Sequence, residues 1–125
     1  MYWMAAAFWA LLIGYLSLVP GNRLPHFSFP HIDKLEHFAC YGILTLLLIL
    51  AQQRSPKFFL KHRHLFKIWL CSAAYGLLLE LLQHWCTTSR QFDLYDVLAN
   101  SAGAALGLAF GRLLLNYKST GSILK

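Results

Sequence analysis

The chain alternates long apolar runs with short polar connections. Charged side chains are nearly absent from four stretches, at about residues 2–19, 35–52, 68–85 and 96–117. Each stretch is roughly 18–22 residues long, and a helix rising 1.5 Å per residue needs about that length to cross a hydrocarbon core of about 30 Å. The pattern therefore predicts an all-α fold, a single domain over residues 1–125 built as a bundle of four transmembrane helices.

Composition supports this prediction, because 58% of the residues are apolar and 13% are charged, whereas soluble domains usually carry about a quarter charged residues. Lys and Arg gather in the connection over residues 52–67 and near the C-terminus. The positive-inside rule then places both termini and this basic connection in the cytoplasm. We interpret the net charge of +6 as a topology signal and as attraction to membrane lipids, and we predict no nucleic-acid partner.

All five acidic residues lie near the ends of the apolar runs that this topology places outside the cytoplasm. Asp33-x-x-Glu36 has the form of a capping box, and Asp93-x-x-Asp96 places carboxylates where the helix dipole favours them. Glu80 has no such explanation. It lies roughly 7–8 Å inside the end of the third run, and a charge at the bilayer centre costs about 2.5–3.5 kcal/mol. We therefore expect Glu80 to face a partner or a cavity, although a purely structural polar contact remains an alternative.

A polar stripe enters the second apolar run from the same end. Asp33, His37 and Tyr41 are spaced by four residues, and Lys34 precedes His37 by three, so these side chains share a helical face. A histidine beside an acid, a lysine and a tyrosine suits a proton shuttle or a ligand. Packing alone is the simpler alternative for a single histidine.

The fourth run carries a matching face. Asp96, Asn100, Gly103 and Gly107 fall at helical spacing on one side. Glycines separated by four residues let helices approach closely, so this face should press the two polar side chains into the bundle. In the third run, Gln83 follows Glu80 by three residues and shares its face. The sequence thus predicts one polar cluster just below the outer surface.

The order of these residues resembles the VanZ-like family of small bacterial membrane proteins. The resemblance rests on the motifs Asp33-Lys34-x-x-His37-x-x-x-Tyr41, Glu80-x-x-Gln83, Arg90, Asp93-x-x-Asp96-x-x-x-Asn100, Gly103 and Gly107. It implies a multi-pass protein of the bacterial cytoplasmic (inner) membrane. The family is named after a protein associated with resistance to the glycopeptide teicoplanin, and the resemblance supplies no reaction and no cofactor.

One hypothesis makes this cluster a site for a lipid head group, a lipid-linked cell-wall intermediate or a lipoglycopeptide. Lys34 and Arg90 would hold phosphate or carboxylate. His37 and Glu80 are the candidate acid and base if a reaction occurs. The remaining candidate ligand-binding residues are Asp33, Tyr41, Gln83, Asp93, Asp96 and Asn100, of which Asp93 and Asp96 would orient the acid and base or hold a divalent cation.

Two alternatives remain open. The first is a proton-coupled small exporter acting as a homo-oligomer, although such sites lie near the membrane midplane. The second is a non-catalytic assembly module in which the cluster is a structural network. Because no HExxH or comparable spacing occurs, we predict no metal site from the sequence.

Overall fold

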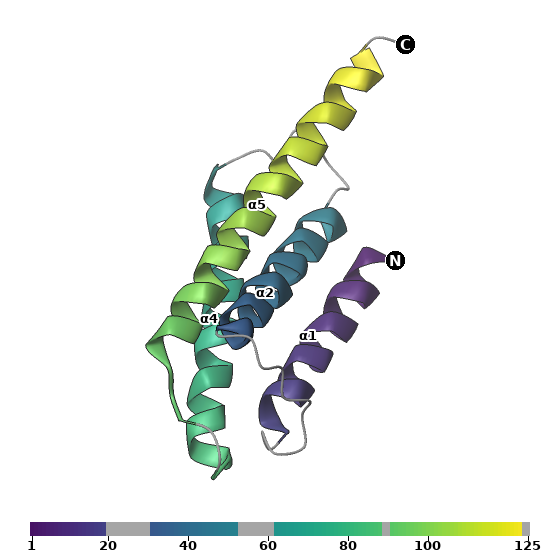
Figure 1. The fold of residues 1–125 in the computed structure, drawn as a ribbon. Helices are drawn as coiled ribbons and strands as arrows, with labels where there is room; N and C mark the ends of the chain where they lie inside the picture. The colour runs from purple at the N-terminus through teal and green to yellow at the C-terminus, as the bar shows by residue number, and fades with distance from the viewer. Residues whose placement is uncertain (20–30, 53–61, 89–90, 124–125) are drawn as a thin grey trace.

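The computed structural model describes residues 1–19, 31–52, 62–88 and 91–123. These residues form four α-helices (Figure 1): α1 (Tyr2–Leu18), α2 (Ile32–Ala51), α4 (His62–Cys86) and α5 (Leu94–Ile123). The predicted all-α, four-helix fold is confirmed. The four prolines of the chain lie outside the bounds of these four helices, as expected for a residue that lacks an amide proton and breaks helix interiors.

Three helix boundaries lie outside the predicted apolar runs. The second helix begins at Ile32 rather than near residue 35, α4 begins at His62 rather than near 68, and α5 continues to Ile123 rather than ending near 117. Apolar runs locate only the part of a helix that suits lipid, whereas the helix itself continues into the polar residues beside them.

The start of α2 corrects one prediction. Its N-cap is His31, which has a φ of 62° and makes no side-chain cap hydrogen bond. Asp33 therefore lies inside the first turn, and its carboxylate accepts a hydrogen bond from Lys34 instead of capping the helix. The predicted capping box of Asp33 and Glu36 is wrong, because the helix begins earlier than the apolar run.

Three helices are long and apolar enough to cross a membrane, namely α2, α4 and the segment Leu94–Tyr117 of α5. The first helix is apolar but has only 17 residues, so its crossing stays a prediction. Large apolar side chains such as Phe8, Leu11, Phe110 and Leu113 are exposed on the bundle, as lipid contact requires. The predicted orientation of the termini is a proposal, and much of the basic connection (residues 53–61) lies outside the described residues.

The glycines of α5 allow it to lie directly against α2. A Cβ atom at Gly103 would overlap the backbone carbonyl of Phe38, and one at Gly107 would overlap that of Gly42. This is the close approach that the glycine spacing predicts. It places the first turns of α2 and α5 side by side at one end of the bundle, where most of the predicted site residues lie (Figure 1).

Hydrogen bonds between side chains and backbone carbonyls connect α1 to α2 and α4. The indole Nε1 of Trp9 donates to the carbonyl of Cys40 at 2.9 Å, and the hydroxyl of Tyr75 donates to the carbonyl of Ala10 at 2.7 Å. The first helix carries no charged side chain, and these bonds attach it to the helices that carry the polar residues.

Candidate functional site

The polar side chains gather where α2 and α5 begin and where α4 approaches its end. We call this group the polar cluster and define it by the residues that hydrogen bonds and close charged contacts connect: Asp33, Lys34, His37, Glu80, Asp93, Asp96 and Asn100. Three helices contribute to it, because the close packing of α2 on α5 brings their N-terminal turns together and α4 packs beside both.

Lys34 is the centre of the outer half of the cluster. Its Nζ lies 2.6 Å from Oδ2 of the adjacent Asp33. It also lies 2.9 Å from Oδ2 of Asp93 and 3.0 Å from Oδ1 of Asp96, both at the start of α5. An ammonium has three donors, so the three carboxylates occupy all of them. Lys34 therefore joins α2 to α5, and an incoming anion would have to displace a carboxylate.

Asp93 caps the N-terminus of α5. Its Oδ1 accepts a hydrogen bond from the backbone N–H of Tyr95 at 2.8 Å, which satisfies a donor that the helix itself leaves unpaired. The hydrogen bond from Lys34, followed by that from the Tyr95 backbone, holds the pKa of the Asp93 carboxyl below its ordinary value. The predicted placement of acids at this helix start is thus observed.

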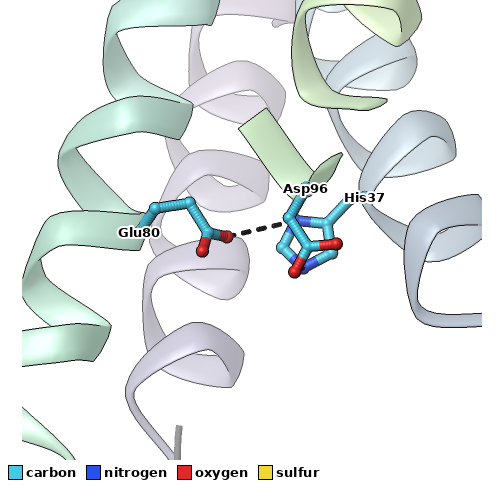
Figure 2. Close-up of side chains that lie close together, drawn as sticks. All are labelled: His37, Glu80 and Asp96. Carbon is cyan, nitrogen blue, oxygen red and sulfur yellow. Dashed lines mark ion pairs between the residues drawn. The ribbon is translucent and has the colours of Figure 1, made fainter. Parts of the chain in front are cut away.

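His37 lies between two carboxylates in the inner half of the cluster (Figure 2). Its Nδ1 is 3.0 Å from Oδ1 of Asn100 and 3.7 Å from Oε1 of Glu80. Its Nε2 is 3.8 Å from Oδ2 of Asp96. Each ring nitrogen therefore faces an oxygen from another helix, an arrangement in which the imidazole can donate a proton on either side.

Two buried atoms of the cluster make no hydrogen bond. Glu80 and Asn100 are each 1% exposed, yet Oε2 of Glu80 and Nδ2 of Asn100 have no partner among the described residues. A buried polar atom left unpaired costs about 1–3 kcal/mol. The described residues therefore leave one acceptor and one donor of the cluster unpaired.

Gly76 makes room for this arrangement and was not among the predicted site residues. A Cβ atom there would lie 2.8 Å from Nδ2 of Asn100 and 3.1 Å from Cε1 of Tyr41. The available signal was a single glycine inside an apolar helix, one turn before Glu80. An isolated glycine in a helix often has a packing reason, and here that reason is the Asn100 side chain.

Comparison with known proteins identifies the family. A family model described as VanZ/LLP1 matches residues 2–115 of the 125-residue chain. The chain belongs to the VanZ/LLP1 family. The resemblance of the polar motifs to VanZ-like proteins is thereby confirmed, and family and helices together indicate a membrane protein. Comparisons with curated proteins and with solved structures gave no match.

Two of the remaining predicted residues of this VanZ/LLP1-family protein, Tyr41 and Gln83, lie on α2 and α4. Tyr41 is 2% exposed and packs in an apolar core with Ile13 and Leu79. Gln83 is buried, and its Nε2 donates to the backbone carbonyl of Ser17 at 2.9 Å, so this amide fastens α1 to α4. Arg90 lies outside the described residues.

The cluster has an exposed half and a buried half with different chemistry. Side-chain exposure falls from 57% at Asp33 to 14% at Asp96 and 1% at Glu80. Around one ammonium, the cluster holds four carboxylates, so carboxylates are in excess when all are ionised. The exposed half is a set of ion pairs, whereas the buried half offers an imidazole and two carboxylates for proton transfer or for binding a cation.

Proposed function

We propose that this VanZ/LLP1-family protein binds the polar head of a membrane lipid, a lipid-linked cell-wall intermediate or a lipoglycopeptide at the polar cluster. The observation that carries the proposal is the burial of the Glu80 carboxylate, at 1% exposure, with one oxygen unpartnered. An ionisable group inside an apolar helix is costly and usually serves a binding or proton pathway. The flanking apolar surfaces would keep the tails of such a ligand in lipid.

The buried half of the cluster would supply the chemistry if the bound molecule reacts. His37 and Glu80 are the candidate acid and base, since their side chains lie 3.7 Å apart, close enough to tighten into a hydrogen bond when a ligand closes the site. Asp96, 3.8 Å from the other ring nitrogen, would orient the imidazole. We place the cluster on the extracytoplasmic side of a bacterial cytoplasmic membrane, as the positive-inside rule favours.

The test compares wild type with Glu80→Gln in a bacterial host lacking its own copy. Sensitivity to teicoplanin and to envelope stress is scored while the membrane level of each protein is measured in the same cells. We expect Glu80→Gln to accumulate in the membrane but to lose the effect of wild type on sensitivity to teicoplanin and envelope stress, which we call the phenotype. The matched control is Glu36→Gln, which makes the same chemical change at an exposed position of α2 and should behave as wild type. A Glu80→Gln protein that accumulates and retains the phenotype contradicts the proposal.

One observation favours a second candidate function, the non-catalytic assembly module. All three donors of Lys34 are occupied by carboxylates, and two of these, Asp93 and Asp96, fasten α2 to α5, which is what a structural network would do. In that case Glu80→Gln would lower the membrane level of the protein, and the cellular effect would decrease in the same proportion. The reason is that removing one member of a buried network leaves the other members without partners. The membrane-level measurement separates the two candidates.

A further inference from the structure

We propose that His37, Glu80 and Asp96 form a binding site for one divalent transition-metal cation. One donor atom from each of these residues lies within 4.8 Å of the other two. The three side chains come from α2, α4 and α5 and point toward one another (Figure 2). Because the donors come from three helices, no local spacing along the chain could predict this set of ligands, and the sequence predicted no metal site beyond the option of a divalent cation at Asp93 and Asp96.

An independent observation points to a missing ligand at this place. Glu80 is 1% exposed, its carboxylate points toward His37 and Asp96, and its Oε2 has no hydrogen-bond partner among the described residues. A carboxylate acts only as an acceptor when ionised. A cation between these three side chains would satisfy the free oxygen and offset the excess of carboxylates over ammonium in the cluster.

The separations suit an ion of the first transition series. Donors to Zn²⁺ lie about 2.0–2.2 Å from the metal, so two donors of one tetrahedral ion are about 3.3–3.6 Å apart. The present donor atoms lie within 4.8 Å of one another, so binding an ion needs the side chains to move inward by up to about 1.5 Å. An imidazole nitrogen with two carboxylates favours Mn²⁺ or Zn²⁺ over Ca²⁺, which takes six to eight oxygens.

Neighbouring groups would orient the histidine for metal binding. A metal-bound imidazole usually donates its other N–H to a carboxylate or amide oxygen, which sets the ring orientation. Oδ1 of Asn100 lies 3.0 Å from Nδ1 of His37 and can accept the Nδ1–H. This leaves Nε2, which is 3.8 Å from Oδ2 of Asp96, to bind the ion.

A bound cation would also restrict which head groups the proposed lipid or cell-wall ligand can carry; this step rests on the proposed function. Lys34 has no donor left for an anion, because three carboxylates occupy it. A bound dication would supply the positive charge that attracts a phosphate or carboxylate head group to a site that otherwise carries excess negative charge.

The experiment titrates Mn²⁺ alone into the purified full-length chain in detergent and follows free Mn²⁺ by electron paramagnetic resonance. We expect saturable binding of one ion, competition by Zn²⁺, and a nitrogen hyperfine coupling from an imidazole. His37→Gln and Glu80→Gln should each weaken binding by roughly tenfold or more, and His37→Gln should abolish the nitrogen coupling. Glu36→Gln, the matched control, should bind as wild type does.

No saturable binding to wild type, no nitrogen coupling, or equal affinity in all variants would overturn the site. If the two cluster variants fail to fold, the wild-type stoichiometry and nitrogen coupling decide the question. The assay needs no phenotype, and the cellular test of Glu80→Gln needs no added metal. If wild type binds Mn²⁺ but Glu80→Gln behaves as wild type in cells, the proposed function is contradicted and the cation site is not. If wild type does not bind Mn²⁺ but Glu80→Gln loses the cellular effect, the cation site alone is contradicted.

Discussion

Gly76 of α4 lies where a methyl group would press against the Asn100 side chain that contacts His37. A Cβ atom at Gly76 would lie 2.8 Å from Nδ2 and 3.0 Å from Cβ of Asn100, and the same amide places Oδ1 3.0 Å from Nδ1 of His37. The geometry of the polar cluster thus depends on a missing side chain on a helix that supplies Glu80 one turn later.

We expect Gly76→Ala to destabilise the protein by about 1–3 kcal/mol, because it overpacks a tight contact. It should also disturb the hydrogen bond between Asn100 and His37. The measurements are thermal unfolding in detergent and the sensitivity of cells to teicoplanin and envelope stress, scored as for Glu80→Gln. Gly14→Ala is the comparison: its nearest atom is the end of a side chain, the Tyr75 hydroxyl at 3.0 Å, so a smaller loss of stability and a normal phenotype are expected. Equal effects at the two glycines would contradict this account.

Substitutions of the α5 glycines should differ in severity along the helix. Gly103→Ala places a methyl group against the backbone of Phe38, which cannot move without moving α2, whereas Gly111→Ala meets only the Ile49 side chain at 2.8 Å. We expect Gly103→Ala to cost more than about 3 kcal/mol and Gly111→Ala about 1–3 kcal/mol. Unfolding in detergent and the level of each variant in membranes measure which substitution is more destabilising. A Gly103→Ala protein as stable as wild type would mean that α2 and α5 do not pack as described.

The ion pairs of Lys34 should contribute unequally to stability. Asp33 is 57% exposed, and an exposed pair contributes about 0–1 kcal/mol, so Asp33→Asn should be nearly neutral. Asp96 is 14% exposed, and losing its charged hydrogen bond should cost about 1.5–3 kcal/mol in Asp96→Asn. Denaturant unfolding of both variants tests this difference, and a larger loss in Asp33→Asn would contradict it.

Acid should weaken the contact between Lys34 and Asp93. The hydrogen bond from Lys34 lowers the pKa of folded Asp93 below its ordinary value. A lowered folded pKa stabilises the folded state above the ordinary value of about 3.9, and this contribution disappears as the pH falls through the lowered value. As the pH drops below about 4, we expect the unfolding temperature of wild type to decrease, and that of Asp93→Asn to decrease less over the same pH range. Identical pH profiles would show that Asp93 does not titrate in this way.

The orientation of the cluster can be tested at Cys86. This exposed residue ends α4 at the cluster end of the bundle. In a chain with only Cys86, a membrane-impermeant maleimide added outside should react, because we place this end outside the cytoplasm. In a chain with only Cys71, exposed on the apolar middle of α4, labelling should need detergent because lipid covers the thiol. Labelling of Cys86 only after permeabilisation would reverse the proposed orientation.

The sequence alone determined the fold class and which residue types gather at one end of the bundle. Long apolar runs define helices that suit lipid, and glycines at a spacing of four predict a close helix contact, because both depend on the period of the helix. The boundaries of α2 and α4 were placed too late, because apolarity reports the lipid-facing part of a helix and not where its hydrogen bonds begin.

Only the tertiary structure decided how the polar groups pair. It assigned Lys34 to three carboxylates, placed His37 between Glu80 and Asp96, and turned Gln83 away to hold α1. It also showed why Gly76 lacks a side chain. These relationships depend on the rotation and depth of one helix against another, to within about an ångström. Helical periodicity shows which residues share a helix face but not which of them pair with residues of another helix. Those pairings decide whether Lys34 is free to bind an anion or is already bonded to carboxylates, as it is here.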